Sequence, residues 1–355
     1  MTGSNAGSLT AAIEAGLART GIPSLSAGVQ RLMTAYHSGD VPAAPVLATK
    51  PDAAAYAAYR MPATAAAISR AVRELRASLP DWAPSSLLDF GAGTGAAAWA
   101  VAEELPSIAS MTLLEQSAEA ITLGRVILGT AEAPSLRTAT WRRWRLTTDT
   151  RRSPTEATAG DLPVEELPAG GVPTADLATV GYVLGELTHA QQSNLVARAA
   201  SAAPAVLVVE PGTPPGHRRI LTARTQLLAA GYVVAAPCPH QLECPLAVEG
   251  DWCHFGARLQ RSAVHRQVKG VELPYEDEKF SYVAAVRATM SVDMAPPPGR
   301  VVRRPLHRKG LVLLDLCTPN GTSRRELVSK SKGDAYRQAR KISWGDSWPP
   351  AGDGR

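Results

Sequence analysis

The sequence predicts a doubly wound α/β fold built on a mostly parallel sheet. From Ser85 onward, apolar segments of strand length alternate with longer segments of helical character. The expected strands are Leu87–Phe90, Met111–Leu114, Trp141–Leu146, Leu177–Leu184 and Ala205–Val209. A glycine-rich turn follows the first of them directly. This alternation is typical of parallel strands joined by crossover helices.

Three further regions surround this core. Residues 1–84 are expected to be helical, because apolar residues recur there at helical spacing at Ile68, Val72, Leu75 and Leu79. The core itself is predicted over residues 85–235, and a cysteine-rich insertion over 236–278. Residues 279–355 are expected to hold the last strands of the core, Tyr282–Ala288 and Leu311–Leu316, and a basic tail.

The composition is that of a globular protein, since 45% of the residues are apolar. The longest apolar runs are strand-sized, well below the roughly 18 residues that a membrane span needs. The N-terminal residues lack the charged and apolar regions of a signal peptide. We therefore expect a cytoplasmic protein without a membrane partner. The sequence does not determine the oligomeric state, for which a monomer is the favoured interpretation.

Charge is distributed unevenly along the chain. Between Arg258 and Lys341 there are 18 Lys and Arg against 8 Asp and Glu, a local balance of +10. The rest of the chain carries 19 against 24, a balance of −5. A basic third on a mildly acidic body favours contact with a polyanion such as RNA, although a solvated basic surface is the alternative.

A glycine-rich motif is the strongest chemical signal. Asp89 precedes Gly91, Gly93 and Gly95, which are spaced as G-x-G-x-G directly after the first strand. Glycines allow the backbone to approach a ligand and to turn into a helix whose first amides favour an anionic group. Glu115 ends the second strand, where its carboxylate could accept both ribose hydroxyls of an adenosine. A nicotinamide-binding domain, which uses the related G-x-G-x-x-G, and a ligand-free turn are the alternatives.

The four cysteines predict a metal site. Cys238, Cys244 and Cys253 lie within 16 residues of each other, and 63 residues separate the third from Cys317. Four thiolates can hold a tetrahedral zinc ion or a four-iron cluster. Zinc knuckles use closer pairs, so the wide spacing favours the cluster. His240 and His254 lie among the cysteines and are expected to be neighbours rather than ligands.

The glycine motif and the acid that ends the second strand resemble those of class I S-adenosylmethionine-dependent methyltransferases, but the sequence does not identify a methyl acceptor. Enzymes that methylate amino groups of bases often carry Asn/Asp-Pro-Pro-aromatic after the fourth strand, where this chain has Gly181–Glu186. An enzyme that methylates C5 of cytosine needs a nucleophilic cysteine. Pro237-Cys238 fits superficially, but ligand duty is the stronger interpretation of Cys238. Catalytic residues are therefore unknown.

Taken together, these motifs resemble the bacterial and mitochondrial methyltransferase-like proteins of the small ribosomal subunit. The matching segments are Tyr59–Thr64, 89–95, Gly181–Leu187, Val209–Pro214, the cysteine segment and Tyr336–Lys341 with the following Trp-Gly-Asp. The likeness runs from about residue 55 to 348 and leaves residues 1–54 outside it.

The resemblance implies a class I methyltransferase fold of seven strands, the last antiparallel, and we expect Leu311–Leu316 to be that strand. It implies S-adenosylmethionine at Asp89, Gly91, Gly93, Gly95 and Glu115, and a 4Fe-4S cluster on the four cysteines, with zinc less favoured. It also implies association with the small ribosomal subunit or its RNA.

Two functions follow from the resemblance: methylation of ribosomal RNA, which we favour, and non-catalytic assembly of the small subunit with the cofactor bound. Methylation of a small molecule is disfavoured by the basic C-terminal third. The RNA-binding candidates are Arg303, Arg304, Arg308, Lys309, Arg324, Arg325, Arg337, Arg340 and Lys341.

Overall fold

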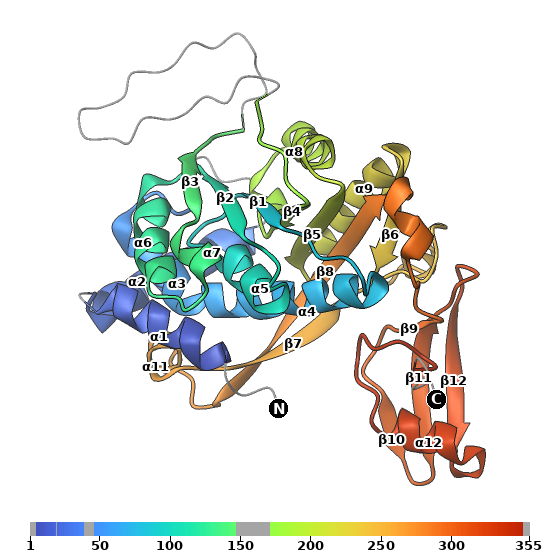
Figure 1. Ribbon diagram of the computed structural model, residues 1–355. Helices are drawn as coiled ribbons and strands as arrows, with labels where there is room; N and C mark the ends of the chain where they lie inside the picture. Colours follow the sequence, from blue (N-terminus) through green and yellow to red (C-terminus); the bar gives the residue numbers. More distant parts are fainter. Residues whose placement is uncertain (1–4, 19, 39–45, 147–170, 351–355) are drawn as a thin grey trace. The chain divides into compact units, whose positions relative to one another are not determined.

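The α/β core of the computed structural model is a mixed sheet of eight strands (Figure 1). The strand order is β3-β2-β1-β4-β5-β8-β6, and β7 pairs with β8. The strands are β1 (Ser86–Phe90), β2 (Ser110–Glu115), β3 (Thr140–Arg143), β4 (Leu177–Gly181), β5 (Ala205–Pro211), β6 (Tyr232–Ala236), β7 (Phe255–Gln260) and β8 (Tyr275–Arg287). β1 pairs in parallel with β2 and with β4, which makes it the centre of the parallel part.

The antiparallel strand of this sheet is β8, so our prediction for Leu311–Leu316 is wrong. β8 lies between β5 and β6 in the strand order and pairs antiparallel with β6, from Tyr232 opposite Arg287 onward. Its residues 280–286 are all buried, as expected of a strand covered on both faces. Leu311–Leu316 belongs instead to a second sheet, in which only alternate side chains are buried over most of the strand.

The structure describes residues 5–18, 20–38, 46–146 and 171–350. The chain divides into two compact units that alternate along the sequence. The first comprises Met1–Val72, Ala83–Leu207 and Ala257–Glu278, and the second comprises Arg73–Trp82, Val208–Gly256 and Lys279–Arg355. Because the units alternate, they do not test the linear segment boundaries given above, which stay predictions.

Helices cover the parallel strands and form the expected N-terminal region. They are α1 (Asn5–Leu17), α2 (Ile22–Ser38), α3 (Lys50–Tyr59), α4 (Met61–Ser78), α5 (Ala96–Glu104), α6 (Ala118–Gly129), α7 (Pro134–Arg137), α8 (His189–Ala202), α9 (Pro214–Ala229), α10 (Pro245–Val248) and α11 (Ala263–Lys269). Thr49 caps α3 by accepting the backbone N–H of Asp52, and Pro51 stands in its first turn. In the described part of the chain, no helix is long and apolar enough to cross a membrane.

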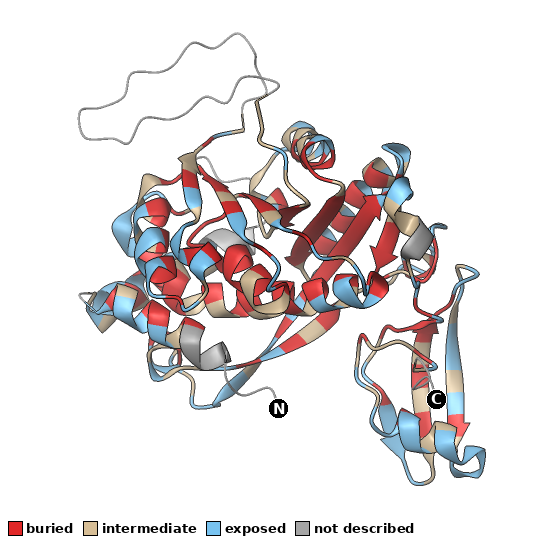
Figure 2. Ribbon diagram, in the orientation of Figure 1, coloured by how far each residue is buried: buried red, intermediate tan, exposed pale blue. Residues whose placement is uncertain are grey.

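The predicted basic tail folds as a second sheet within the second unit. Its order is β10-β11-β12, and β9 also pairs with β11. The elements are β9 (Arg300–Val301), β10 (Leu306–Arg308), β11 (Leu311–Cys317), β12 (Ser323–Ser329) and the helix α12 (Asp334–Ala339). One sheet face packs on α12 through a core that includes Val312, Leu314, Val328 and Ala339. Figure 2 shows the contrast between buried and exposed residues along β11 and β12.

A matched glycine pair in α6 tests how tightly this helix packs on β3. A Cβ atom at Gly124 would lie 2.5 Å from the Trp141 ring, whereas nothing lies within 4 Å of one at Gly129. Gly124→Ala should lower the free energy of unfolding by about 1–3 kcal/mol through overpacking. Gly129→Ala should raise it by about 0.5 kcal/mol through helix propensity. Urea unfolding of both variants measures this; destabilisation by both or by neither would contradict the packing described.

Candidate cofactor site and four-cysteine cavity

The glycine loop between β1 and α5 is held against the end of β2 by backbone hydrogen bonds. The amides of Gly91 and Ala92 both donate to the carbonyl of Leu114, at 2.8 and 3.0 Å. Gly91, Gly93 and Gly95 have φ of 72°, 56° and 96°, a left-handed conformation that glycine adopts without steric cost. Gly95 is also the N-cap of α5. The sequence motif therefore forms the turn that we predicted for it.

Glu115 lies under this loop at the carboxyl end of β2. Its side chain is buried and accepts the amide N–H of Gly93 at 2.9 Å and that of Ser117 at 2.8 Å. Burial raises the pKa of Glu115, and the backbone hydrogen bonds oppose that rise. The carboxylate is thus fixed between the glycine loop and the start of α6.

Asp89 is the second buried carboxyl group at this edge of the sheet. Thr179 of β4 donates its hydroxyl to Asp89 Oδ1 at 2.6 Å, whereas Oδ2 is buried without a hydrogen-bond partner among the described residues. Burial raises the pKa of Asp89 to about 7, and the nearby Glu115 carboxylate adds to the shift. An unpaired buried oxygen is costly, so this atom is suited to receive a donor from a bound molecule.

Side chains from the N-terminal helical region cover the loop, which the sequence analysis did not foresee. A Cβ atom at Gly93 would lie 3.5 Å from the ring of Tyr56 on α3 and 3.8 Å from Leu47. The Ser117 hydroxyl donates to the Leu47 carbonyl. The only sequence signal for this contact was an aromatic residue in an otherwise alanine-rich helix.

A polar cluster surrounds Tyr182, which follows β4. Tyr182 is the one non-glycine residue in the described chain with positive φ, at 60°. Its hydroxyl donates to Glu278 at 3.0 Å, and Arg60 donates to both oxygens of the same carboxylate at 2.8 and 3.2 Å. Backbone strain of this kind concentrates at functional sites. Arg60 and Glu278 were missed because they are 218 residues apart in the chain.

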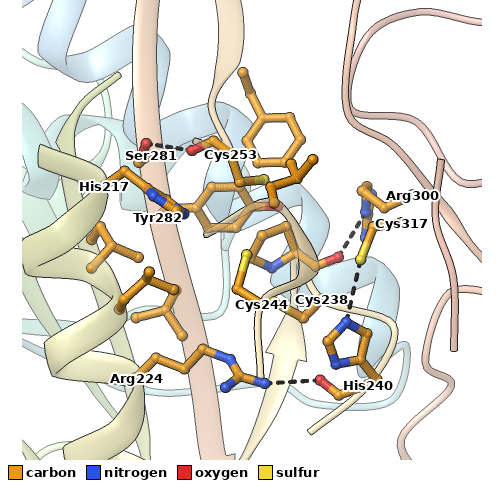
Figure 3. A pocket seen from close by; sticks show the side chains of 16 residues that line it. His217, Arg224, Cys238, His240, Cys244, Cys253, Ser281, Tyr282, Arg300 and Cys317 are labelled. Carbon is orange, nitrogen blue, oxygen red and sulfur yellow. Dashed lines mark hydrogen bonds between the residues drawn. The ribbon is translucent and has the colours of Figure 1, made fainter. Parts of the chain in front are cut away.

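The four cysteines line one cavity of about 30 Å³ in the second unit (Figure 3). Cys238 follows β6, Cys244 is the N-cap of α10, Cys253 precedes β7 and Cys317 ends β11. The cavity has room for more than one water molecule. The structure thus brings together all four cysteines that the sequence analysis singled out.

Two buried arginines stand beside the thiols. Arg224 donates from one terminal nitrogen to the carbonyls of His240 and Leu242, and its Nε has no partner among the described residues. Arg300 donates to the Pro237 carbonyl at 2.9 Å and forms an ion pair with Glu74. Positive charge next to four sulfur atoms favours the thiolate form.

Burial makes the thiols hard to ionise despite these arginines. Burial raises the pKa of Cys238 and that of Cys253, and it raises the pKa of Cys317 to about 12. Neighbouring thiolates raise all three further, whereas Arg224 lowers the pKa of Cys238 and Cys317. The cavity therefore favours neutral thiols unless a cationic group neutralises them.

The two histidines of the cysteine segment take different positions. His240 lines the cavity, with Nε2 3.3 Å from the Cys317 sulfur. His254 stacks on Trp252 and packs edge-on against Trp344, and it does not line the cavity. Over the described ranges, no group of three or more His, Cys, Asp or Glu side chains is arranged to hold a single metal ion.

The basic residues predicted to bind RNA all lie in the second unit, on or near the second sheet. Ion pairs in this unit join Arg303 to Asp251, Arg324 to Glu326, Arg325 to Asp315 and Arg337 to Asp334. Arg308 and Lys309 stand at the β10–β11 turn, and Arg340 and Lys341 follow α12. Each arginine in these ion pairs has a carboxylate beside it, which reduces the positive charge that it offers to a ligand.

In the main sheet, one antiparallel strand lies between β5 and β6, and a glycine loop follows β1. These features define a class I methyltransferase-like α/β fold. The family model "Mitochondrial small ribosomal subunit Rsm22" matches residues 50–349. The chain belongs to this family.

Relatives in the family come from mitochondria. The human "Ribosome assembly protein METTL17, mitochondrial" is 29% identical over 310 residues, 83% of this chain and 62% of the relative. The Saccharomyces cerevisiae "Ribosome assembly protein RSM22, mitochondrial" is 26% identical over 180 residues, 33% of this chain and 29% of the relative. The chain thus spans less than two thirds of either relative. Our prediction of a cytoplasmic location conflicts with these mitochondrial names and is withdrawn.

Solved structures with a similar fold are distant. A putative RNA methyltransferase, PH1948, from Pyrococcus horikoshii has a TM-score of 0.39 at 14% identity, covering 64% of this chain and 87% of that one. Magnesium protoporphyrin IX methyltransferase from Synechocystis, with bound SAM, has a TM-score of 0.37 at 12% identity. The match covers 64% of this chain and 80% of that one. Likenesses this remote carry no conclusion about the ligand of this chain.

The raised pKa of Asp89 predicts a pH-dependent stability. The folded protein keeps this proton up to about pH 7, whereas the unfolded chain loses it near pH 4. Stability should therefore fall as pH rises from about 4 to about 7 and then level off. Asp89→Asn removes the titration while its amide oxygen still accepts from Thr179. The variant should gain as much as about 4 kcal/mol over the wild type at pH 8 and much less near pH 4.

Urea unfolding of both proteins at several pH values measures this difference. Comparison with the wild type cancels the contribution of the acidic groups that do not interact with Asp89. Parallel stability profiles for the two proteins would contradict a buried, protonated Asp89.

Proposed function

We propose that this protein binds S-adenosylmethionine in the first unit and acts on the small ribosomal subunit, with ribosomal RNA as the methyl acceptor. The observation that carries the proposal is the family match over residues 50–349. A glycine loop and two buried carboxyl groups at the carboxyl ends of β1 and β2 support cofactor binding, because ligands of such sheets bind at that edge.

The residues of the first unit fit the cofactor by their chemistry. Glu115 would accept hydrogen bonds from the ribose hydroxyls in place of one of the backbone amides that it now binds. The left-handed glycines would allow the cofactor to lie close to the loop backbone. Asp89 has a buried oxygen without a partner, which suits it to the ammonium of the methionine part. When bound, the cofactor supplies a methyl group activated by its sulfonium. Transfer from a sulfonium needs an oriented acceptor more than an acid or a base.

A non-catalytic assembly factor is the second candidate. Its support is the segment Gly181–Glu186, which lacks the Asn/Asp-Pro-Pro motif, and the name of the human relative as a ribosome assembly protein. Such a protein would use the same cofactor site and the same basic surface without methyl transfer.

We also propose a 4Fe-4S cluster on Cys238, Cys244, Cys253 and Cys317. The convergence of the four thiols on one cavity with two buried arginines supports it. Four thiolates on one zinc ion must all lie about 2.3 Å from its centre, whereas a cluster holds its sulfur ligands farther apart. The cysteines are widely spaced in the sequence, without the close pairs of zinc knuckles, which favours the cluster.

Calorimetric titration with S-adenosylmethionine tests the cofactor site. Glu115→Ala combined with Gly93→Asp should abolish binding, because the pair removes the ribose acceptor and places a side chain in the loop. The exposed Glu132→Ala on the same unit is the control and should bind as the wild type does. Undiminished affinity of the double variant would refute the site.

The same double variant separates the two candidate functions in cells. Methylated nucleotides of the small-subunit RNA are mapped with the wild-type gene, the variant gene and no gene. A methyl group that disappears in the last two strains supports the enzyme. An unchanged methylation pattern together with a reduced yield of small subunits supports the assembly factor.

The cluster proposal predicts a specific loss in Cys317→Ser. The variant should lose its iron, its acid-labile sulfide and its visible absorption, and its second unit should be destabilised because cluster binding is coupled to folding. Titration with S-adenosylmethionine should be unaffected. Ser323→Ala, directly opposite Cys317 in the sheet, is the control and should keep the iron. Zinc in the wild-type protein, or full iron in the variant, would contradict the cluster.

A further inference from the structure

Three leucines form a continuous row across the second sheet. The strand register places Leu306 of β10 opposite Leu313 of β11, and Leu313 opposite Leu327 of β12. Residues directly opposite each other in neighbouring strands point to the same face and touch. The row therefore crosses three strands on one sheet face.

This face is the one that α12 does not cover. Val312, Leu314 and Val328 point to the other face and pack with Ala339 of α12. Leu306 keeps 45% of its surface exposed, and Leu327 keeps 55%. Leu313, between them, is partly buried. Large apolar side chains gathered on one exposed surface mark interaction sites more often than singly scattered ones do.

The residues that border the row are charged. Arg308 and Lys309 stand at the β10–β11 turn on one side and form no ion pair with another described residue. Asp315 and Arg325 pair with each other on the other side, opposite one another in the register. An unneutralised positive edge beside an apolar row is complementary to apolar side chains that are bordered by carboxylates.

The composition of the face disfavours RNA as its occupant. Sheets that bind RNA stack bases on aromatic rings. The outward positions are Leu306, Arg308, Leu311, Leu313, Asp315, Arg325, Leu327 and Ser329, and none of them is aromatic. Leucine offers neither a stacking ring nor a charge for phosphate, and its burial rewards contact with another apolar surface.

We propose that the row Leu306–Leu313–Leu327 docks a protein component of the small ribosomal subunit that presents apolar side chains bordered by acidic ones. The inference rests on the proposed action on the small subunit and deepens it by naming the surface and its kind of partner. Two contacts to the subunit are then distinct: a protein contact through the leucine row, and RNA contacts through the remaining basic residues.

The experiment compares binding to intact small subunits with binding to small-subunit RNA stripped of protein. The variant is Leu306→Thr with Leu327→Thr, because threonine keeps the strand propensity and removes most of the apolar surface. The control is Leu273→Thr, an equally exposed leucine, at 60%, outside the second sheet. Thermal unfolding and sedimentation of all three proteins accompany the binding measurements.

The double variant should bind intact subunits about 100-fold more weakly than the wild type, which is about tenfold for each buried leucine. Its affinity for the stripped RNA should be unchanged, and the control should match the wild type in both assays. Equal affinity of variant and wild type for subunits would overturn the inference and leave the proposed function standing. An equal loss on stripped RNA would overturn it in favour of an RNA-binding face.

Two further outcomes assign the face to this chain itself. If the wild type is a dimer and the double variant is a monomer, a second copy of the chain covers the row. If the double variant unfolds well below the unfolding temperature of the control variant, another part of the same chain covers the row. Either result overturns the proposed partner. A wild-type protein that binds neither subunits nor their RNA refutes the proposed function, and this inference falls with it.

Discussion

The end of β2 is the fixed point on which the candidate cofactor site depends. Leu114 and Glu115 there accept three backbone amides of the glycine loop, from Gly91, Ala92 and Gly93. The loop can meet both acceptors only because its glycines adopt a left-handed backbone, which a side chain would strain. This arrangement sets where α5 begins and holds the two buried carboxyl groups at one edge of the sheet. A change in the loop backbone would therefore move Glu115, the start of α5 and the surface below Tyr56 together.

The second unit depends on a different constraint, the burial of arginine. Arg300 is 2% exposed, and its guanidinium joins the Pro237 carbonyl, the Gly345 carbonyl and Glu74. A buried charge is tolerated only when it is paired and hydrogen-bonded, so these three segments must meet wherever Arg300 lies. The segment after β6 that begins with Pro237 carries the first cysteine. One buried cation thus helps to bring the cysteine segment to the strands of the second sheet.

Local chemistry in the sequence was enough to predict the cofactor side of the fold. The first strand, the glycine turn and the acid that ends β2 are signalled by adjacent residues, and the structure has them in the expected places. The identity of the antiparallel strand was not predictable in this way. Both 282–288 and 311–316 are apolar strands, and only long-range packing decides that β8 enters the core while β11 starts another sheet. The pairing of Arg60 with Glu278 and the cover by Tyr56 were missed for the same reason.

Cys317 shows how a correct grouping can follow from a wrong topology. We grouped it with the other cysteines and placed the strand before it in the main sheet, yet it reaches their cavity from the end of β11 in the second sheet. Its neighbour in the chain, Leu316, packs into the core of that sheet, and Cys317 itself packs with Leu246 and Val302. The cysteine therefore joins the hydrophobic core of the small sheet to the cavity. The end of β11 is held there by its pairing with Arg300 and Ser323 and by these apolar contacts, so a change at the four thiols would act directly on the end of the second sheet.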